Sequence, residues 1–210
     1  REVDSKKGEL RNRIESIFEE ASSQGARFII LRCGDFLGPE MPADSCWLGH
    51  MVDKALDGGP ITYPGPMDTL HQWAYLPDAA TVAVDLVERA DDFDPFEIFH
   101  FRGYVAEPAE FIDAIRTALG DPNRRVKSFP WWATWFLAPF QPFMRELRDV
   151  RYVWDEPIQL DDTKLRRTLG DLPQTPLEEA VRRSIAGMEA EVAETEERQI
   201  GRGGAEAQRG

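Results

Sequence analysis

A helical pattern that leads into a short buried strand constrains the fold of this chain most. Between residues 5 and 22, apolar residues recur at helical spacing and charged residues fill most other positions. "SQG" then ends the helix, and residues 28–31 form an unbroken apolar run. Such a run is typical of a strand that is covered on both faces in a parallel sheet. Helix, tight turn and buried strand together make half of a βαβ unit.

The remaining pattern alternates helices with short strands, which predicts an α/β protein. Helical patterns lie at 47–56, 77–90, 107–120, within 143–153, at 160–170 and at 175–194, and strand patterns lie at 60–66, 71–78, 96–101 and 124–129. Asp78 and Thr175 are the expected N-caps of two helices. We predict that residues 1–40 end an incomplete Rossmann-like, doubly wound parallel sheet. Residues 41–197 should form mainly a small α+β substrate lobe that returns in places to the sheet, and residues 198–210 a flexible tail.

The balance of charge excludes two classes of partner. The net charge of −13 comes from 38 acidic and 25 basic residues. Such a surface repels nucleic-acid phosphates and anionic membranes, so we expect neither as a partner. No stretch reaches the roughly 18 uninterrupted apolar residues that a membrane helix needs. The only two cysteines, Cys33 and Cys46, make neither a disulfide framework nor a zinc site, so we predict reduced thiols, no metal and a cytoplasmic protein.

Four motifs in order resemble those of the NAD(P)-dependent epimerase/dehydratase family, the extended or atypical short-chain dehydrogenases/reductases. "SKKGELRNRIESIF" resembles the helix with the family's catalytic lysine, and "FIILRCGDFLGP" resembles the strand and loop written ILRPGNVYGP in many members. "HQWAYLPDAATVAVDLVE" resembles RDFVHVDDVARAVLLALE. "LDDTKLRRTLGDLPQTPLEEAVRRSI" resembles the closing D-x-x-K-x-x-x-x-L-G … T-x-L-x-E-G-L stretch. The resemblance covers roughly residues 5–190.

The resemblance implies a C-terminal fragment of an oxidoreductase, epimerase or dehydratase that uses NAD or NADP. No Gly-rich turn opens a helix in this sequence, so the half that holds the dinucleotide pyrophosphate would precede Arg1. The substrate would be a small carbonyl or hydroxyl compound, and the fragment alone would be inactive. The alternative is a non-catalytic NAD(P)-binding sensor or assembly protein with the same fold.

Lys7 is the residue that best matches the family's catalytic lysine, which also binds the nicotinamide ribose. In the family this lysine lowers the pKa of a tyrosine four residues earlier, so that a phenolate acts near neutral pH. Here that position holds Val3. The alternative is that Lys6 and Lys7 are solvated charges at the start of a helix.

The strand tip at residues 33–36 is the predicted floor of the pocket, because ligands of open α/β sheets lie at the carboxyl ends of strands. By resemblance, the backbone of Cys33, Gly34 and Asp35 faces the nicotinamide, and Asp35 and Phe36 point toward substrate. Gly34 would let the backbone approach a flat ring. Cys33, which replaces the family's proline, reads as a small apolar group. Asp35 could equally be a turn or cap residue.

The predicted substrate contacts are Trp47, His71, Gln72 and Tyr75. Many sugar-nucleotide members carry an arginine at the position of His71 to bind the diphosphate, and a histidine lacks that permanent fork of donors. A nucleotide-sugar substrate is therefore disfavoured. Alternatively, Trp47 and Tyr75 are plain packing residues.

An aromatic segment at 129–143, "FPWWATWFLAPFQPF", lies outside these motifs. We expect it to pack as a cover on the small lobe or to contact a protein partner, including a second copy of the chain. An interfacial membrane anchor is a third reading, which the acidic composition disfavours.

Overall fold

The computed structural model describes the backbone of residues 6–138, 144, 147–148 and 150–207. The side chains of residues 6–7, 192 and 194–207 lie outside the described part. The descriptions below concern the part of the chain that is described.

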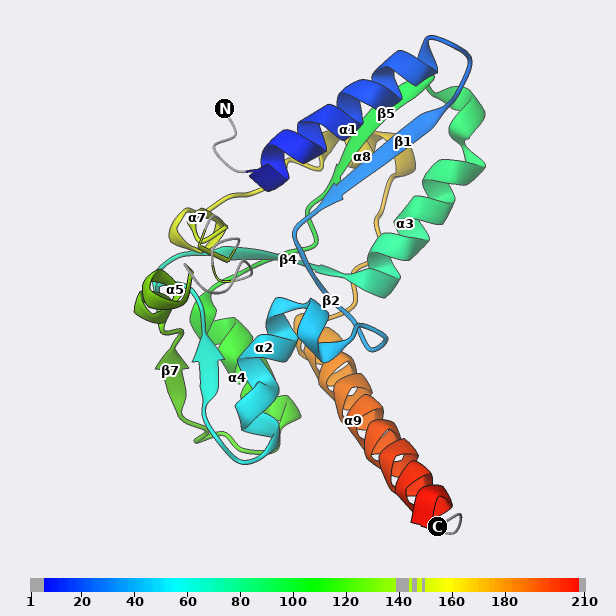
Figure 1. Cartoon of the computed structure of the whole chain (residues 1–210). Coiled ribbons are helices and arrows are strands. Elements are labelled where there is room, and N and C mark those ends of the chain that lie inside the picture. The colour runs from blue at the N-terminus through cyan, green and yellow to red at the C-terminus, as the bar shows by residue number, and fades with distance from the viewer. Residues whose placement is uncertain (1–5, 139–143, 145–146, 149, 208–210) are drawn as a thin grey trace.

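A pair of parallel strands forms the upper layer of the molecule (Figure 1). β1 (Phe28–Cys33) pairs with β5 (Phe96–Phe101), and Cys33 lies opposite Phe101 at the carboxyl end. α1 (Lys6–Ser22) covers one face, where Phe18 stacks on Phe28 at 4.6 Å between ring centroids. α3 (Leu76–Glu88) and α8 (Thr163–Leu169) cover the other face, where Leu31 and Cys33 pack against them. The prediction of an α/β fold with a parallel strand at residues 28–33 is confirmed, although every residue of β1 is only partly buried.

A smaller lobe follows in the lower part of Figure 1. Its central sheet has β4 (His71–Tyr75) between β2 (Asp35–Leu37), which is parallel to it, and β6 (Tyr104–Ala106), which is antiparallel. A second pair joins β3 (Ile61–Tyr63) to β7 (Val126–Ser128) in parallel. The helices are α2 (Trp47–Leu56), α4 (Pro108–Ala118), α5 (Trp131–Leu137), α7 (Tyr152–Asp155) and α9 (Leu177–Ala207), with a short 3₁₀ turn at Ala43–Ser45. A second 3₁₀ turn, Ala90–Asp92, follows α3.

β4 lies between two hydrophobic clusters and is buried along its whole length. Its odd positions, Trp73 and Tyr75, belong to the core of the lobe, together with α2, α4 and α9. Ala74 points the other way, into the cluster beneath the β1–β5 pair. Because successive side chains of a strand alternate between faces, one short strand couples both cores.

Two predicted helix caps are wrong, because α3 begins at Leu76 and α9 begins at Leu177. The two residues bond to each other instead. α3 begins at Leu76, so Asp78 lies inside its first turn rather than at the N-cap. The Asp78 carboxylate accepts hydrogen bonds from the Thr175 N–H at 2.7 Å and the Thr175 hydroxyl at 2.9 Å. This contact ties the start of α3 to the chain just before α9.

The chain departs from the predicted pattern at three further places. β6 was not predicted, because three residues carry too little periodicity to identify a strand. α9 continues to Ala207, through most of the segment expected to be a tail. The apolar stripe of α1 is not wholly covered within this chain, since Leu10, Ile14 and Ile17 are exposed.

Gly103 should be the glycine least tolerant of substitution. It has φ of +56°, and a Cβ there would lie 2.2 Å from the carbonyl oxygen of Trp73. Gly120 is a matched control, since its φ is +65° but no atom lies within 4 Å of a built Cβ. We expect Gly120→Ala to lower the free energy of unfolding by about 1–2 kcal/mol from backbone strain. Gly103→Ala should cost about 3 kcal/mol or more, because overpacking adds to the strain. Urea unfolding of the full-length protein measures both, and equal losses would contradict the clash.

Asp78→Ala should destabilise the fold by about 2–3 kcal/mol, because it leaves two donors of Thr175 without their charged acceptor. Glu88→Ala, at an exposed acid on the same helix, is the control and should change stability by less than about 0.5 kcal/mol. Thermal or urea unfolding compares the two variants. If Asp78→Ala proved as neutral as the control, the contact would not hold α3 to the α9 segment.

Candidate functional site

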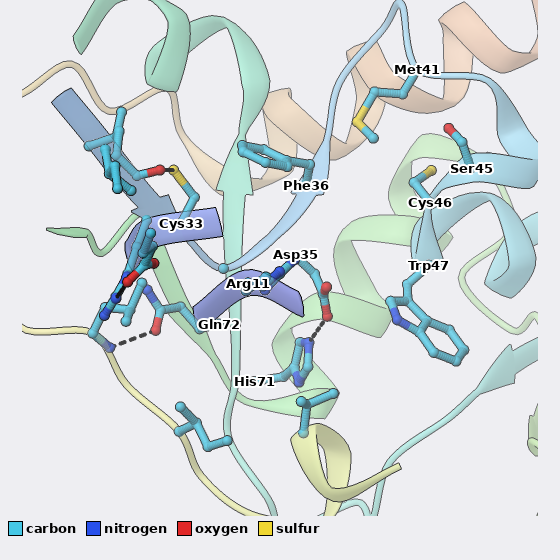
Figure 2. Close-up of a pocket in the computed structure, with 18 of the residues that line it drawn as sticks. Arg11, Cys33, Asp35, Phe36, Met41, Ser45, Cys46, Trp47, His71 and Gln72 are labelled. Carbon is cyan, nitrogen blue, oxygen red and sulfur yellow. Dashed lines mark hydrogen bonds and ion pairs between the residues drawn. The ribbon is translucent and has the colours of Figure 1, made fainter. Parts of the chain in front are cut away.

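A pocket of about 730 Å³ opens at the carboxyl end of β1. Its walls come from α1, the β1–β2 tip, the start of α2, β4 and the segment 152–160. Seven of the residues predicted for the site line it: Cys33, Gly34, Asp35, Phe36, Trp47, His71 and Gln72. Figure 2 shows most of them around one space, although they come from elements far apart in the sequence.

Asp35 and His71 form the polar centre of this pocket. His71 Nε2 lies 2.8 Å from Asp35 Oδ2, as the dashed line in Figure 2 shows. Both residues stand on the same face of the parallel β2–β4 pair, where Asp35 is in register with Trp73. The side chain of Asp35 is 35% exposed, whereas that of His71 is only 6% exposed. The carboxylate therefore faces the pocket, and the imidazole supports it from behind.

An aromatic stack fixes the imidazole of His71. Trp154 on α7 lies parallel to it, with 3.7 Å between ring centroids and 2° between planes. Trp154 is itself buried and meets Trp47 edge-on at 5.1 Å. Trp73 contacts the imidazole edge-on at 4.9 Å. The histidine is thus held between rings, and its orientation toward Asp35 is set by packing.

Gln72 lies in the pocket wall, but its amide is engaged on both sides. Nε2 donates to the carbonyl of Arg102 at 2.7 Å, and Oε1 accepts from the N–H of Leu160 at 2.8 Å. Because these bonds join β4 to two separate loops, Gln72 serves the structure of the pocket wall.

Gly34 is required by the packing of the strand tip. A Cβ at this position would lie 2.5 Å from the carbonyl oxygen of Gln72. The absence of a side chain therefore lets the β1–β2 tip cross close to β4, which is a different reason from the close ligand approach that the sequence suggested.

Cys33 and Cys46 both line the pocket as free thiols. Burial raises the pKa of Cys33 to about 11, so this thiol is protonated at neutral pH and is a poor nucleophile. Burial also raises the pKa of Cys46. The sulfur of Cys46 caps α2 by accepting a hydrogen bond from the N–H of Gly49 at 3.4 Å.

Phe36 and Trp47 serve both the pocket and the cores. Phe36 lines the pocket and packs against the cluster beneath the β1–β5 pair. Trp47, at the start of α2, packs on the core of the lobe from the pocket side.

Tyr75 corrects one prediction, since it does not line this pocket. It is 2% exposed and belongs to the core of the lobe. It lies on the same face of β4 as His71 and Trp73, but four residues beyond His71 along the strand. Tyr75 is therefore a packing residue, which was the alternative prediction from the sequence.

Lys7 lies in the first turn of α1, and its side chain is outside the described residues. Arg11, one helical turn later, lines the pocket together with Ile14, Glu15 and Phe18. This spacing of three and four residues is that of one helix face.

Several pocket residues were missed from the sequence. Arg11 could have been found by extending the helix face from Lys7. Ser45 and Tyr152 also line the pocket, and Trp154 holds His71 without lining it. Tyr152 and Trp154 carried no signal, because nothing in the sequence places residues 152–154 beside β4.

The described residues contain no group of three or more His, Cys, Asp or Glu side chains that could hold a metal ion. Among the same residues, no helix combines the length and the apolar character needed to cross a membrane.

Comparison with known proteins finds one family model that matches part of the chain. Residues 12–100 match the model of the NAD dependent epimerase/dehydratase family. The match includes the strand tip, Trp47 and β4, and it begins after Lys7. No curated protein matches the sequence.

Solved structures show the same fold at low identity. GalE-like L-threonine dehydrogenase from Cupriavidus necator is 20% identical, with a TM-score of 0.61 over 83% of this chain and 58% of that one. DesIV, a dTDP-glucose 4,6-dehydratase from Streptomyces venezuelae solved with NAD and TYD bound, is 19% identical, with a TM-score of 0.61 over 82% and 47%. RMD from Pseudomonas aeruginosa, solved with NADPH, is 12% identical, with a TM-score of 0.59 over 84% and 53%.

The chain spans about half the length of the structures that it matches. NAD is bound in two of these structures, both dTDP-glucose 4,6-dehydratases, and NADPH is bound in RMD. The resemblance seen in the motifs is confirmed: residues 12–100 match the NAD-dependent epimerase/dehydratase family, and the chain has the fold of that family's solved structures.

Proposed function

We propose that the full-length protein is an NAD(P)-dependent oxidoreductase, epimerase or dehydratase, and that this chain supplies the substrate side of its pocket. The substrate is a small carbonyl or hydroxyl compound. One observation supports this most: the family's strand tip and its β4 motif meet in one pocket at the carboxyl end of β1, where sheets of this kind bind ligands.

The described residues fit the nicotinamide end of such a cofactor. Ile30, Leu31 and Phe36 give the pocket apolar walls around the strand tip, as a flat ring requires. The pyrophosphate must lie elsewhere, because the pocket offers it little positive charge: Arg32 is paired with Glu15 at 2.5 Å. When bound, the cofactor exchanges a hydride at its nicotinamide ring. In this proposal Lys7 holds the ribose, and residues 33–35 flank the ring.

The proposed proton transfer cannot use the family's tyrosine at its usual place. Val3 stands four residues before Lys7, and a valine side chain cannot exchange a proton. In the proposal, Asp35 exchanges the proton instead, and His71 holds its carboxylate in place by a hydrogen bond. This substitution changes which group exchanges the proton and leaves the hydride chemistry to the cofactor.

An exposed aromatic face favours the alternative of a non-catalytic NAD(P)-binding sensor or assembly protein. Phe129 and Trp131 of the aromatic segment pack inward near Trp47, as expected for a segment that covers the lobe. Trp132, Trp135 and Phe136 of α5 are instead 67%, 61% and 72% exposed. Exposed aromatics so close together are typical of contact surfaces. Residues 139–143 of the segment lie outside the described part.

The proposal predicts that the full-length protein binds NADH or NADPH, measured by the change in nicotinamide fluorescence. Lys7→Ala should weaken this binding at least about tenfold, the effect of losing a charge-assisted hydrogen bond. Lys6→Ala, the adjacent lysine, is the matched control and should bind as the unaltered protein does. The absence of binding to either nucleotide would overturn the cofactor proposal, and equal affinities of the two variants would remove Lys7 from the site.

The alternative predicts a different outcome for the α5 face. Trp135→Ser should dissociate an assembly through this face and lower the mass of the full-length protein in light scattering, while NADH binding stays unchanged. Val84→Ser, at an exposed apolar residue of α3, is the control. If Trp135→Ser altered neither the mass nor capture by a purified partner, the α5 face would not be a contact.

A further inference from the structure

We infer that this pocket takes a small substrate carrying both an anionic group and a hydroxyl or ammonium donor, and that it rejects nucleoside diphosphates. The inference rests on the proposed function for its setting beside a nicotinamide. It follows from which charged groups of the pocket are already engaged with other parts of the protein and which are not.

Asp35 provides the site for the donor. Its Oδ2 bonds to His71, and its Oδ1 has no hydrogen bond with any described residue. An ionised carboxylate only accepts hydrogen bonds, so a ligand at Oδ1 must donate one. Hydroxyl and ammonium groups satisfy this requirement, whereas a phosphate oxygen would repel the carboxylate at close range.

His71 makes this carboxylate a fixed feature of the wall. The imidazole is stacked on Trp154 at 3.7 Å, and its side chain is 6% exposed, so it cannot turn into the pocket to bind an anion itself. A group that is already oriented loses little freedom when a ligand arrives, which favours binding.

Arg11 provides the site for the anionic group. Its guanidinium is exposed, lines the pocket, and makes no hydrogen bond or ion pair with a described residue. Arg32, the other arginine of the pocket wall, is paired with Glu15 through two hydrogen bonds. A carboxylate suits a free guanidinium, because the two can form parallel hydrogen bonds.

A nucleoside diphosphate fits this arrangement poorly. It would place two phosphates in a pocket wall with one unengaged arginine and a carboxylate held in place by His71. A phosphate oxygen beside Asp35 has no donor for Oδ1 and is repelled by the carboxylate, so the pocket selects against it.

Binding of matched small molecules to the full-length protein tests the inference by calorimetry, with and without NAD⁺. The probe 3-hydroxybutyrate has both groups, butyrate lacks the donor, 2-butanol lacks the anion, and UDP carries the diphosphate. We expect 3-hydroxybutyrate to bind at least tenfold more tightly than butyrate or 2-butanol, and UDP not to bind when saturating NAD⁺ fills the dinucleotide site. No preference for 3-hydroxybutyrate, or binding of UDP in the presence of NAD⁺ as tight as that of 3-hydroxybutyrate, would overturn the inference.

Variants assign the two groups. Asp35→Asn should reduce 3-hydroxybutyrate binding to the level of butyrate, and Arg11→Gln should reduce it to the level of 2-butanol. Asp44→Asn and Arg13→Gln are charge-matched controls outside the pocket wall, and they should bind within twofold of the unaltered protein. Equal losses in a variant and its control would remove that residue from the substrate site. Arg11→Gln alters an exposed side chain, so its result does not depend on a change in folding.

Failure of the inference is separable from failure of the proposed function. If NADH and NADPH do not bind but 3-hydroxybutyrate binds through Asp35 and Arg11, the ligand site stands and the cofactor proposal falls. If the nucleotides bind and the matched probes show no preference, the cofactor proposal stands and the inference falls.

Discussion

The burial of β4 on both of its faces is the constraint on which the rest of the structure depends. Its odd side chains enter the core of the lobe, and Ala74 enters the cluster beneath the β1–β5 pair. The strand must therefore pass very close to the β1–β2 tip, which explains why position 34 has no side chain. Because β4 is packed on both sides, the positions of His71 and Gln72 at its start are fixed as firmly as those of core residues, although both line the pocket.

The outer wall of the pocket depends on contacts with residues distant in the sequence. Trp154 reaches His71 from α7, and the N–H of Leu160 bonds to Gln72. Neither residue belongs to the sheet. The segment that holds them joins the lobe to α8, which packs on the β1–β5 pair. The pocket thus lies where the chain returns from the lobe to the sheet, and stability of either part affects its shape.

Local periodicity allowed many of the helices and strands to be predicted. Contacts between residues far apart in the sequence could not be predicted in this way. The helix at Trp47–Leu56 and the strand at Phe96–Phe101 have the predicted bounds, because each carries a clear apolar pattern and a turn signal at its end. Asp35 and His71 were each predicted as site residues, but 36 positions separate them and no local pattern reports their contact. Tyr75 shares the face of His71 but lies four residues further along β4, and a strand that is buried along its whole length gives no polar signal to show where the pocket ends.

Two of the departures from the family motifs at the pocket are physically linked. Where many members read ILRPGNVYGP this chain has Asp35 at the asparagine position, and His71 replaces the arginine that opens RDFVHVDD. Asp35 alone would place an unpaired carboxylate on a half-buried wall, and His71 alone would leave a stacked ring without a polar partner. Together they satisfy each other at 2.8 Å, and one oxygen of Asp35 has no described partner. A permanent cation at position 71 favours a diphosphate, whereas this pair presents an acceptor to the pocket, so the same two positions set opposite preferences for charge.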